Sequence, residues 1–251
     1  DYCTEWYMQH DPKYLLELSN GKKKLPLTDK KDILMRCIYG VDIDVHAVEV
    51  SKFSLLIKLI EDETPASVKE CVPILPDLSS NIKNGNSLIC REDICEKYIS
   101  IETLCNIKPF EWSVINRGLK FDAIIGNPPY VKTEDIHTLE TEVEFAIYKK
   151  KYKSAYKQFD KYFLFLEEAF NLLKENGQMC YIVPNKFYKI GAGQKLRRII
   201  SKHISKLDDF GDMQLFPDKT IYSCIVTLCK ERSRQMEYTN VTSLIDLWTG
   251  E

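Results

Sequence analysis

The sequence predicts an α/β fold, in which a mostly parallel sheet carries helices on both faces. Two observations support this class. Apolar, strand-like runs alternate with amphipathic, helix-like segments, and 251 residues with 44% hydrophobic content can bury the core of one domain. The formal net charge is only −2. Any contact with a polyanion such as nucleic acid must therefore come from a local patch of charge.

The first part of the chain is expected to supply the opening elements of this sheet. Residues 45–60 carry a long apolar stripe that favours a helix, formed by Val48, Phe53, Leu55, Leu56, Leu59 and Ile60. The other elements expected here are a helix over 2–18, a helix end or loop over 33–41 that leads into a strand, a loop or short helix over 65–76, and a short strand with its turn over 81–88.

The second part continues the alternation. Residues 121–126 form a short apolar run that ends in glycine, which predicts a buried strand. Residues 159–174 predict an amphipathic helix, which the turn-forming run Glu175-Asn176-Gly177 should close. The remaining expected elements are strands over 179–183, 204–210 and 222–229 and a helix over 193–202.

The composition argues against membrane insertion and metal binding. No apolar run approaches about 18 residues and no basic-then-apolar leader opens the chain, so we expect no membrane span. Nine scattered cysteines predict reduced, mostly buried thiols in a cytoplasmic protein. The pairs Cys90/Cys95 and Cys224/Cys229 lack the spacing of a metal site, and the four histidines stand far apart. We therefore expect no metal.

The most informative stretch is Asn127-Pro128-Pro129-Tyr130, directly after the predicted strand 121–126. The prolines fix the backbone and remove two donors, which leaves the Asn127 side-chain oxygen and the Pro128 carbonyl as acceptors beside an aromatic ring. Such a loop suits a flat molecule with an exocyclic amino group, because the acceptors take its two N–H bonds while Tyr130 stacks on its face. We predict that these four residues form a catalytic loop; a proline-rich turn with a surface tyrosine is the alternative.

Other polar residues are expected at the carboxyl ends of strands, where sheets of this kind bind ligands. Asp42 ends a predicted strand, and its carboxylate can accept both hydroxyls of a ribose. Asp44 is better placed as the N-cap of the following helix. Asn86 is a candidate for the adenine edge of a nucleoside cofactor, although an ordinary Asn turn fits equally well. We assign Asp42, Ile43, Asn86, Ser87 and Asn127 to the cofactor site.

The polar segment between Tyr130 and Phe159 is rich in lysine and tyrosine. Basic side chains interleaved with aromatic rings suit a phosphate backbone and unstacked bases. A solvated helix face explains the pattern equally well. On the first interpretation, the DNA-binding residues of this segment are Lys149, Lys150, Lys151 and Lys153.

Taken in order, these motifs resemble a known group. The run Gly40-Val41-Asp42-Ile43-Asp44, then Gly85-Asn86-Ser87, then Asn-Pro-Pro-Tyr looks like an amino-methyltransferase that uses S-adenosylmethionine. The closer resemblance is to gamma-class N6-adenine DNA methyltransferases, and within them to Eco57I-like methylase domains of type II restriction-modification proteins. Two later segments carry it: the helix–strand–Pro block over 162–186 and Leu215-Phe216-Pro217-Asp218-Lys219. The resemblance covers roughly residues 35 to 230.

The resemblance implies a Rossmann-like, S-adenosylmethionine-dependent methyltransferase fold in the cytoplasm with double-stranded DNA as partner. It implies that Asn127 and the Pro128 carbonyl hold the target amine of a flipped adenine. Tyr130 and Phe216 would stack on the two faces of that base, and Lys219 would contact DNA. In such proteins a nuclease and a target-recognition domain accompany the methylase.

The chain also departs from the family pattern. It has no glycine-rich segment of the Phe/Cys-Gly-x-Gly type, and residues 1–7 resemble the helix that follows that segment. We therefore expect a sheet without its first strand, in a partial catalytic domain over residues 1–230. Residues 231–251 are expected to be a linker or the start of a target-recognition region. The Glu-x-Lys of a nuclease does not occur, so we expect no cleavage by this chain.

Three functions are compatible with these motifs. The first is DNA adenine-N6 methylation. The second keeps the enzyme class but changes the substrate to a ribosomal RNA base or a protein glutamine amide. A second stacking ring at Phe216 argues against the glutamine amide. The third is a catalytically inactive module that binds nucleic acid.

Overall fold

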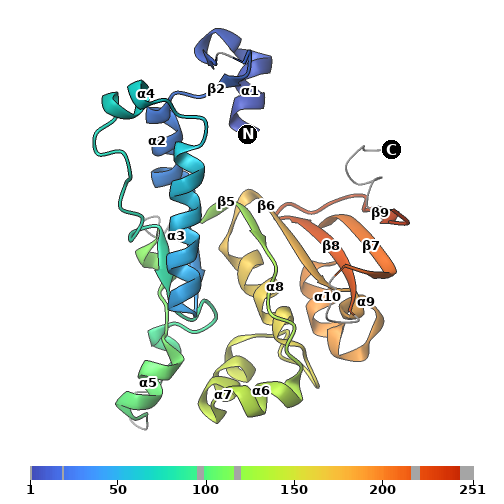
Figure 1. Cartoon of the computed structure of the whole chain (residues 1–251). Coiled ribbons are helices and arrows are strands. Elements are labelled where there is room, and N and C mark those ends of the chain that lie inside the picture. Colours follow the sequence, from blue (N-terminus) through green and yellow to red (C-terminus); the bar gives the residue numbers. More distant parts are fainter. Residues whose placement is uncertain (1, 19, 95–98, 116–119, 216–220, 244–251) are drawn as a thin grey trace. The chain divides into compact units, whose positions relative to one another are not determined.

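The computed structural model describes residues 2–18, 20–94, 99–115, 120–215 and 221–243. The chain divides into two compact units. The first contains residues 1–87 and 110–118, and the second contains residues 88–109 and 119–251 (Figure 1). Each unit has its own hydrophobic core. The sequence predicts one partial catalytic domain over residues 1–230, and the two units divide this range between them.

The first unit is built around one long helix. Its elements are α1 (Tyr2–His10), the 3-10 turn Pro12–Tyr14, β1 (Leu16–Glu17), β2 (Lys23–Lys24), α2 (Leu27–Cys37), β3 (Gly40–Asp42), α3 (Val45–Ile60), α4 (Pro65–Glu70), β4 (Ile82–Asn84) and the 3-10 turn Trp112–Val114. The predicted helix over residues 2–18 is wrong beyond His10, because Pro12 disfavours a helical residue before it.

The long helix α3 has the bounds that the sequence predicts, and it begins at the predicted cap. The Asp44 side chain accepts a hydrogen bond from the His46 backbone N–H at 2.9 Å. Val48 and Leu59 face the core of the unit. The predicted single stripe is wrong for Phe53 and Ile60, which lie on the opposite face and are 65% and 40% exposed.

Strands β3 and β4 are parallel neighbours, and two asparagines fix their ends. The Asn81 amide donates to the Met35 and Ile38 carbonyls at 2.8 and 2.9 Å, so it satisfies the open end of α2 beside the start of β3. The Asn84 amide donates to the Asp42 and Ile43 carbonyls, both at 3.0 Å. The backbone at the end of β3 is therefore held in place.

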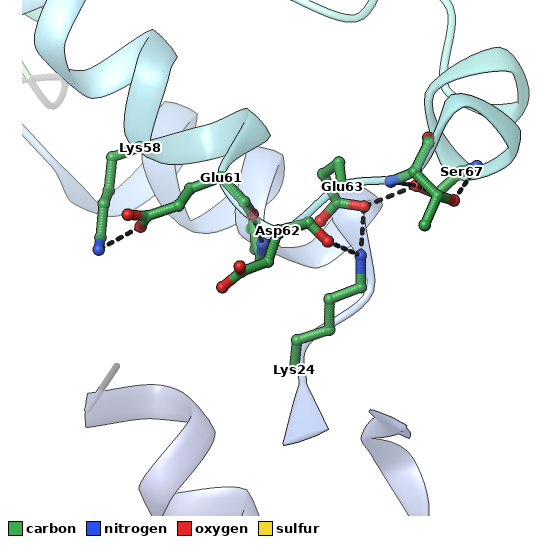
Figure 2. A network of polar contacts seen from close by, with 8 residues as sticks. Lys24, Lys58, Glu61, Asp62, Glu63 and Ser67 are labelled. Carbon is green, nitrogen blue, oxygen red and sulfur yellow. Dashed lines mark hydrogen bonds and ion pairs between the residues drawn. The ribbon is translucent and has the colours of Figure 1, made fainter. Parts of the chain in front are cut away.

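A buried ion network closes the other end of α3 (Figure 2). The Glu63 carboxylate, whose side chain is 1% exposed, accepts from Lys24 at 2.6 Å, Lys30 at 2.8 Å and Ser67 at 2.7 Å. Lys24 also donates to the Asp62 carbonyl at 2.9 Å. Burial raises the pKa of Glu63, but these donors outweigh it and hold the pKa below its ordinary value. The network joins β2, α2 and α4 to the end of α3.

The second unit contains a five-stranded sheet in the order β5-β6-β8-β7-β9 (Figure 1). Its elements are the 3-10 turn Arg91–Asp93, α5 (Ile101–Ile107), β5 (Phe121–Gly126), α6 (Thr133–Leu139), α7 (Glu142–Lys151), α8 (Lys161–Leu172), β6 (Leu173–Pro184), α9 (Lys186–Lys189), the 3-10 turn Gly191–Gly193, α10 (Gln194–Ile200), β7 (Ile204–Gln214), β8 (Tyr222–Cys229) and β9 (Glu237–Asn240). The α/β class is confirmed.

The pairing in this sheet is mixed. β5 is parallel to β6, and β7 is parallel to β9, whereas β8 is antiparallel to both of its neighbours. The core of the unit packs large aromatic side chains against the sheet, with Phe159, Tyr162 and Phe163 at 0% exposure. Helix α8, which supplies two of them, lies beside β6.

Two details of the sheet differ from the sequence predictions. The predicted buried strand 121–126 is an edge strand among the described residues, where β5 pairs with β6 alone, and its Ile125 side chain is 83% exposed. The predicted turn Glu175-Asn176-Gly177 does not close α8, which ends at Leu172. These residues lie inside β6, where the register with β5 shifts.

The described cysteines are free thiols, but the prediction that most are buried is wrong, since among them Cys71 and Cys224 are the buried ones. None of the helices in the described ranges is long and apolar enough to cross a membrane. The same ranges contain no cluster of three or more His, Cys, Asp or Glu side chains suited to a metal ion.

Candidate active site

The Asn-Pro-Pro-Tyr loop leaves the sheet where β5 ends, as the sequence predicts. The last residue of the strand, Gly126, pairs with Tyr181 of β6. A Cβ on Gly126 would lie 2.9 Å from the Tyr181 ring, closer than real contacts allow. Glycine is therefore needed here so that the aromatic ring can pack against the strand directly before the loop.

The Asn127 side chain is exposed and its carboxamide is held from one side. The Tyr130 hydroxyl lies 2.7 Å from Asn127 Oδ1 and 3.0 Å from the Ile182 carbonyl oxygen of β6. A phenol has one hydrogen to donate, so the two acceptors share it. A carbonyl oxygen has two lone pairs, and the second lone pair of Asn127 Oδ1 remains suited to accept from a ligand amine.

The Tyr130 ring is half-buried. It meets the Tyr162 ring edge to face, with centroids 6.2 Å apart at 77°, and the buried Tyr162 hydroxyl donates to the Pro184 carbonyl at 3.0 Å. Burial, with a smaller contribution from Cys224, raises the pKa of the Tyr130 phenol to about 12. The hydroxyl is therefore a neutral donor at physiological pH. Between Asn127 and Tyr130, Pro128 is buried and Pro129 is exposed.

The predicted partner ring and its neighbour cannot be placed. Phe216 and Lys219 lie outside the described residues. The proposed sandwich of Tyr130 and Phe216 around a base therefore stays a prediction.

The predicted ribose ligand Asp42 lies at the carboxyl end of β3, in the first unit. Its side chain is exposed, and Oδ1 accepts from the Asp44 N–H at 2.8 Å, which fixes the carboxylate orientation. The neighbouring Ile43 side chain is 45% exposed. A fixed carboxylate beside an apolar side chain offers acceptors for a sugar diol and a surface for a flat ring.

The predicted cofactor residues Asn86 and Ser87 follow β4 in the same unit. Asn86 is 4% exposed. Two aromatic residues that the sequence analysis did not assign support this turn. The Trp112 indole donates to the Ser87 carbonyl at 2.9 Å, and a Cβ on Gly85 would lie 2.8 Å from Phe110. These rings come from a segment that is distant in the sequence, so no local sequence pattern predicts that they contact the turn.

A second group of unassigned residues fixes the end of β6. The buried Asp209 carboxylate accepts from Asn185 at 2.9 Å and from the Tyr188 hydroxyl at 2.5 Å. The Gly211 N–H donates to it at 3.2 Å. Burial raises the pKa of Asp209, but these hydrogen bonds hold it below its ordinary value. The network ties Asn185 to β7, three positions beyond the Ile182 carbonyl that Tyr130 contacts.

The four predicted DNA-binding lysines divide into two kinds. Lys149 Nζ donates to the Ala155 carbonyl at 3.1 Å and lies 4.9 Å from the Phe159 ring centre. Lys151 Nζ pairs with Asp93 at 2.7 Å and donates to a backbone carbonyl at 3.1 Å. These two ammonium groups serve contacts within the unit. The side chains of Lys150 and Lys153 are exposed, as is that of Lys149, but among the described residues no hydrogen bond or ion pair engages the Nζ of Lys150 or Lys153.

An α/β sheet that presents an Asn-Pro-Pro-Tyr loop at a strand end has the features of a methylase. The family comparison names the class more closely: the model of the Eco57I restriction-modification methylase family matches residues 36–216, so the chain belongs to this family. The resemblance inferred from the sequence is thereby confirmed.

The chain is also similar to individual type II enzymes. The chain is 44% identical over 243 residues to the type II restriction enzyme and methyltransferase RM.Eco57I of Escherichia coli, a match that covers 96% of this chain and 23% of that protein. It is 36% identical over 84 residues to the type II methyltransferase M.BstVI of Geobacillus stearothermophilus, across 34% of this chain and 14% of the relative. The chain thus spans less than a quarter of either relative.

Solved structures share the fold. A nuclease-deletion mutant of the Type ISP restriction-modification enzyme LlaGI, in complex with a DNA substrate mimic, superposes with a TM-score of 0.59 and 16% identity over 96% of this chain and 20% of that chain. The DrdV–DNA complex gives a TM-score of 0.54 and 14% identity over 86% of this chain and 22% of that chain. At these identities the likeness concerns the fold alone.

Proposed function

We propose that this protein methylates the N6 amine of adenine at specific sites in double-stranded DNA, within a restriction-modification system and with S-adenosylmethionine as the methyl donor. The observation that carries the proposal is the exposed Asn127 carboxamide, which Tyr130 orients at the end of β5. Membership of the Eco57I methylase family and the names of the type II relatives support it.

The role of the loop follows from the weakness of the nucleophile. The amine of adenine is conjugated with its ring, so its lone pair is poorly available. Asn127 Oδ1 and the Pro128 carbonyl accept its two hydrogens, which favours a pyramidal nitrogen with the lone pair directed at the methyl donor. The methyl group would pass directly and in line from the sulfonium to N6, without a covalent enzyme intermediate. The S–CH3 bond would break as the N–CH3 bond forms, the thioether would leave, and the methylated nitrogen would lose one proton to solvent. The rate enhancement then comes from positioning and preorganised acceptors.

The chemistry of the first unit fits the cofactor. S-adenosylmethionine supplies a methyl group on a sulfonium together with an adenosine that must be bound. Asp42 would accept the ribose hydroxyls, and its carboxylate is already oriented by the Asp44 N–H. The exposed Ile43 side chain suits the adenine face. Asn86 and Ser87 lie on the neighbouring strand end, at the turn that Trp112 fixes.

The target adenine must leave the duplex to reach the loop, because N6 is shielded inside the stack. Tyr130 would stack on the flipped base, and Phe216 would cover its other face. Stacking of this kind contributes about 1–3 kcal/mol per base. The proposal extends to a cytoplasmic protein whose full-length form also carries a target-recognition domain and a nuclease.

The proposal is tested by methyl transfer from radiolabelled S-adenosylmethionine to unmethylated duplex DNA, RNA and bulk protein, followed by nucleoside chromatography. We expect label in duplex DNA as N6-methyladenine. Asn127→Ala should lower turnover by about 10²- to 10³-fold, the loss that follows removal of one preorganised polar group. It should leave the melting temperature nearly unchanged, since the side chain is exposed. Label confined to RNA or protein, or full activity of the variant, would refute the proposal.

A further inference from the structure

The structure separates lysines that stabilise the second unit from lysines that are available to a ligand. The ammonium groups of Lys149 and Lys151 contact backbone carbonyls, aromatic rings and Asp93. Burial lowers the pKa of Lys151, but Asp93 and Glu168 together outweigh it and raise that pKa. Their replacement would remove these contacts within the unit. The lysine-rich segment that the sequence singles out therefore offers only part of its charge to a partner.

A different group of lysines lies where the catalytic loop leaves the sheet. We call Lys132, Lys186 and Lys189 the strand-end lysines. β5 and β6 are parallel, with Gly126 opposite Tyr181. The segments that follow these strands therefore leave at the same edge of the sheet. Lys132 comes two residues after Tyr130, and Lys186 begins α9, two residues after Pro184.

Contacts within the unit bring these segments together. Lys132 forms a β-bridge with Asp160, and the Lys161 N–H donates to the Val131 carbonyl at 2.8 Å. Tyr162, two residues beyond Asp160, donates to the carbonyl of Pro184. The segment that contains Asp160 thus joins the residues after Tyr130 to the end of β6.

The pKa of Asp160 also reflects the proximity of Lys132 and Lys186 to its carboxyl. Burial raises the pKa of its carboxyl, and Lys186 and Lys132 both oppose that rise. Glu134 is the acidic side chain that acts in the same direction as burial.

The strand-end lysines are accessible. All three side chains are exposed. Within the part of the chain that the structure describes, no hydrogen bond or ion pair engages their Nζ atoms; Lys189 Nζ lies 5.2 Å from the Tyr188 ring centre. Lys186 and Lys189 stand three residues apart on one helical turn and so project to the same side.

We propose that the strand-end lysines bind backbone phosphates of the DNA strand on either side of the flipped adenine. The inference rests on the proposed function and identifies the surface that contacts the substrate. Three ammonium groups beside the catalytic loop attract a polyanion where a base must enter that loop. Lysine is suited to this role, because it acts as a flexible point charge without base specificity.

The test measures affinity for a random-sequence DNA duplex against salt concentration, by fluorescence anisotropy. Non-specific binding depends on phosphate contacts, so no recognition sequence is required. The first variant is K132Q/K186Q/K189Q. The second is K150Q/K153Q, which removes two exposed charges from the segment that the sequence favours. K202Q, at the opposite end of the sheet, is the control for a loss of charge in general. Thermal melting checks the fold of each.

We expect K132Q/K186Q/K189Q to make the slope of log K against log salt less negative by about 2 to 3, since each phosphate contact contributes about 0.9. The other two variants should shift the slope by less per lysine. An unchanged slope in the first variant, or an equal shift per lysine in all three, overturns the inference. If the wild-type protein methylates DNA while the first variant binds it normally, this inference fails and the proposed function stands. If the wild-type protein transfers no methyl group to DNA, the proposed function itself fails.

Discussion

The replacement of Tyr130 by phenylalanine separates the two roles that we propose for this residue. The ring is proposed to stack on the flipped base, and the hydroxyl, which lies 2.7 Å from Asn127 Oδ1, is proposed to orient the carboxamide. Phenylalanine keeps the ring and removes the hydroxyl. We expect a lower kcat with little change in DNA affinity, because the acceptor is then free to rotate away from the target amine.

The magnitude follows from the lost hydrogen bond. A hydrogen bond of this kind contributes about 1 kcal/mol net, which corresponds to about a fivefold loss of kcat if the whole bond orients the acceptor. Tyr130→Ala also removes the stacking ring, worth about 1–3 kcal/mol, so DNA binding should weaken by a further 5- to 150-fold or so. The first variant should therefore act mainly on kcat, and the second on DNA affinity as well.

The assay is steady-state methyl transfer to unmethylated genomic DNA, with kcat and KM determined for wild type, Tyr130→Phe, Tyr130→Ala and Tyr162→Phe. Tyr162 is the matched control, since its hydroxyl also donates to a carbonyl at the end of β6 but makes no contact with Asn127. Its loss should cost stability and leave kcat near the wild-type value. A wild-type kcat in Tyr130→Phe, or an equal loss in Tyr162→Phe, would refute the orienting role of the hydroxyl.

Two further predictions concern the first unit. Asp42→Ala should weaken S-adenosylmethionine binding by roughly tenfold or more in calorimetry, because it removes a charged acceptor. Asp44→Ala should cost about 1 kcal/mol of stability through the lost helix cap and leave cofactor affinity nearly unchanged. The reverse pattern would exchange the roles of the two residues. Glu63→Gln should destabilise the unit by about 3 kcal/mol, because two largely buried lysines lose their counter-ion. Since folding lowers the pKa of Glu63 below its ordinary value of 4.5, its contribution is present above that pH and is lost as the pH falls through the lower, folded-state pKa. Acid unfolding of wild type and Glu63→Gln that runs in parallel through this window would contradict the assignment.

The sequence by itself determined the elements whose signals are local. Helix α3 and strand β8 have the predicted bounds, and Asp44 caps α3, because periodicity and capping chemistry act within a few residues. The motifs at the strand ends were sufficient to identify the family. The position of the Asn-Pro-Pro-Tyr loop at the end of β5 also followed from the apolar run before it.

Tertiary structure decided which side chains are free to act. The same lysine-rich run contains Lys151, which pairs with Asp93 from a distant segment, and Lys153, whose side chain is exposed. Tyr130 reaches a carbonyl on β6 that lies 52 residues further along the chain. The edge position of β5 and the network of Asp209 likewise depend on pairing between strands. Such contacts join residues far apart in sequence, so their geometry is set by packing and leaves no periodic signal.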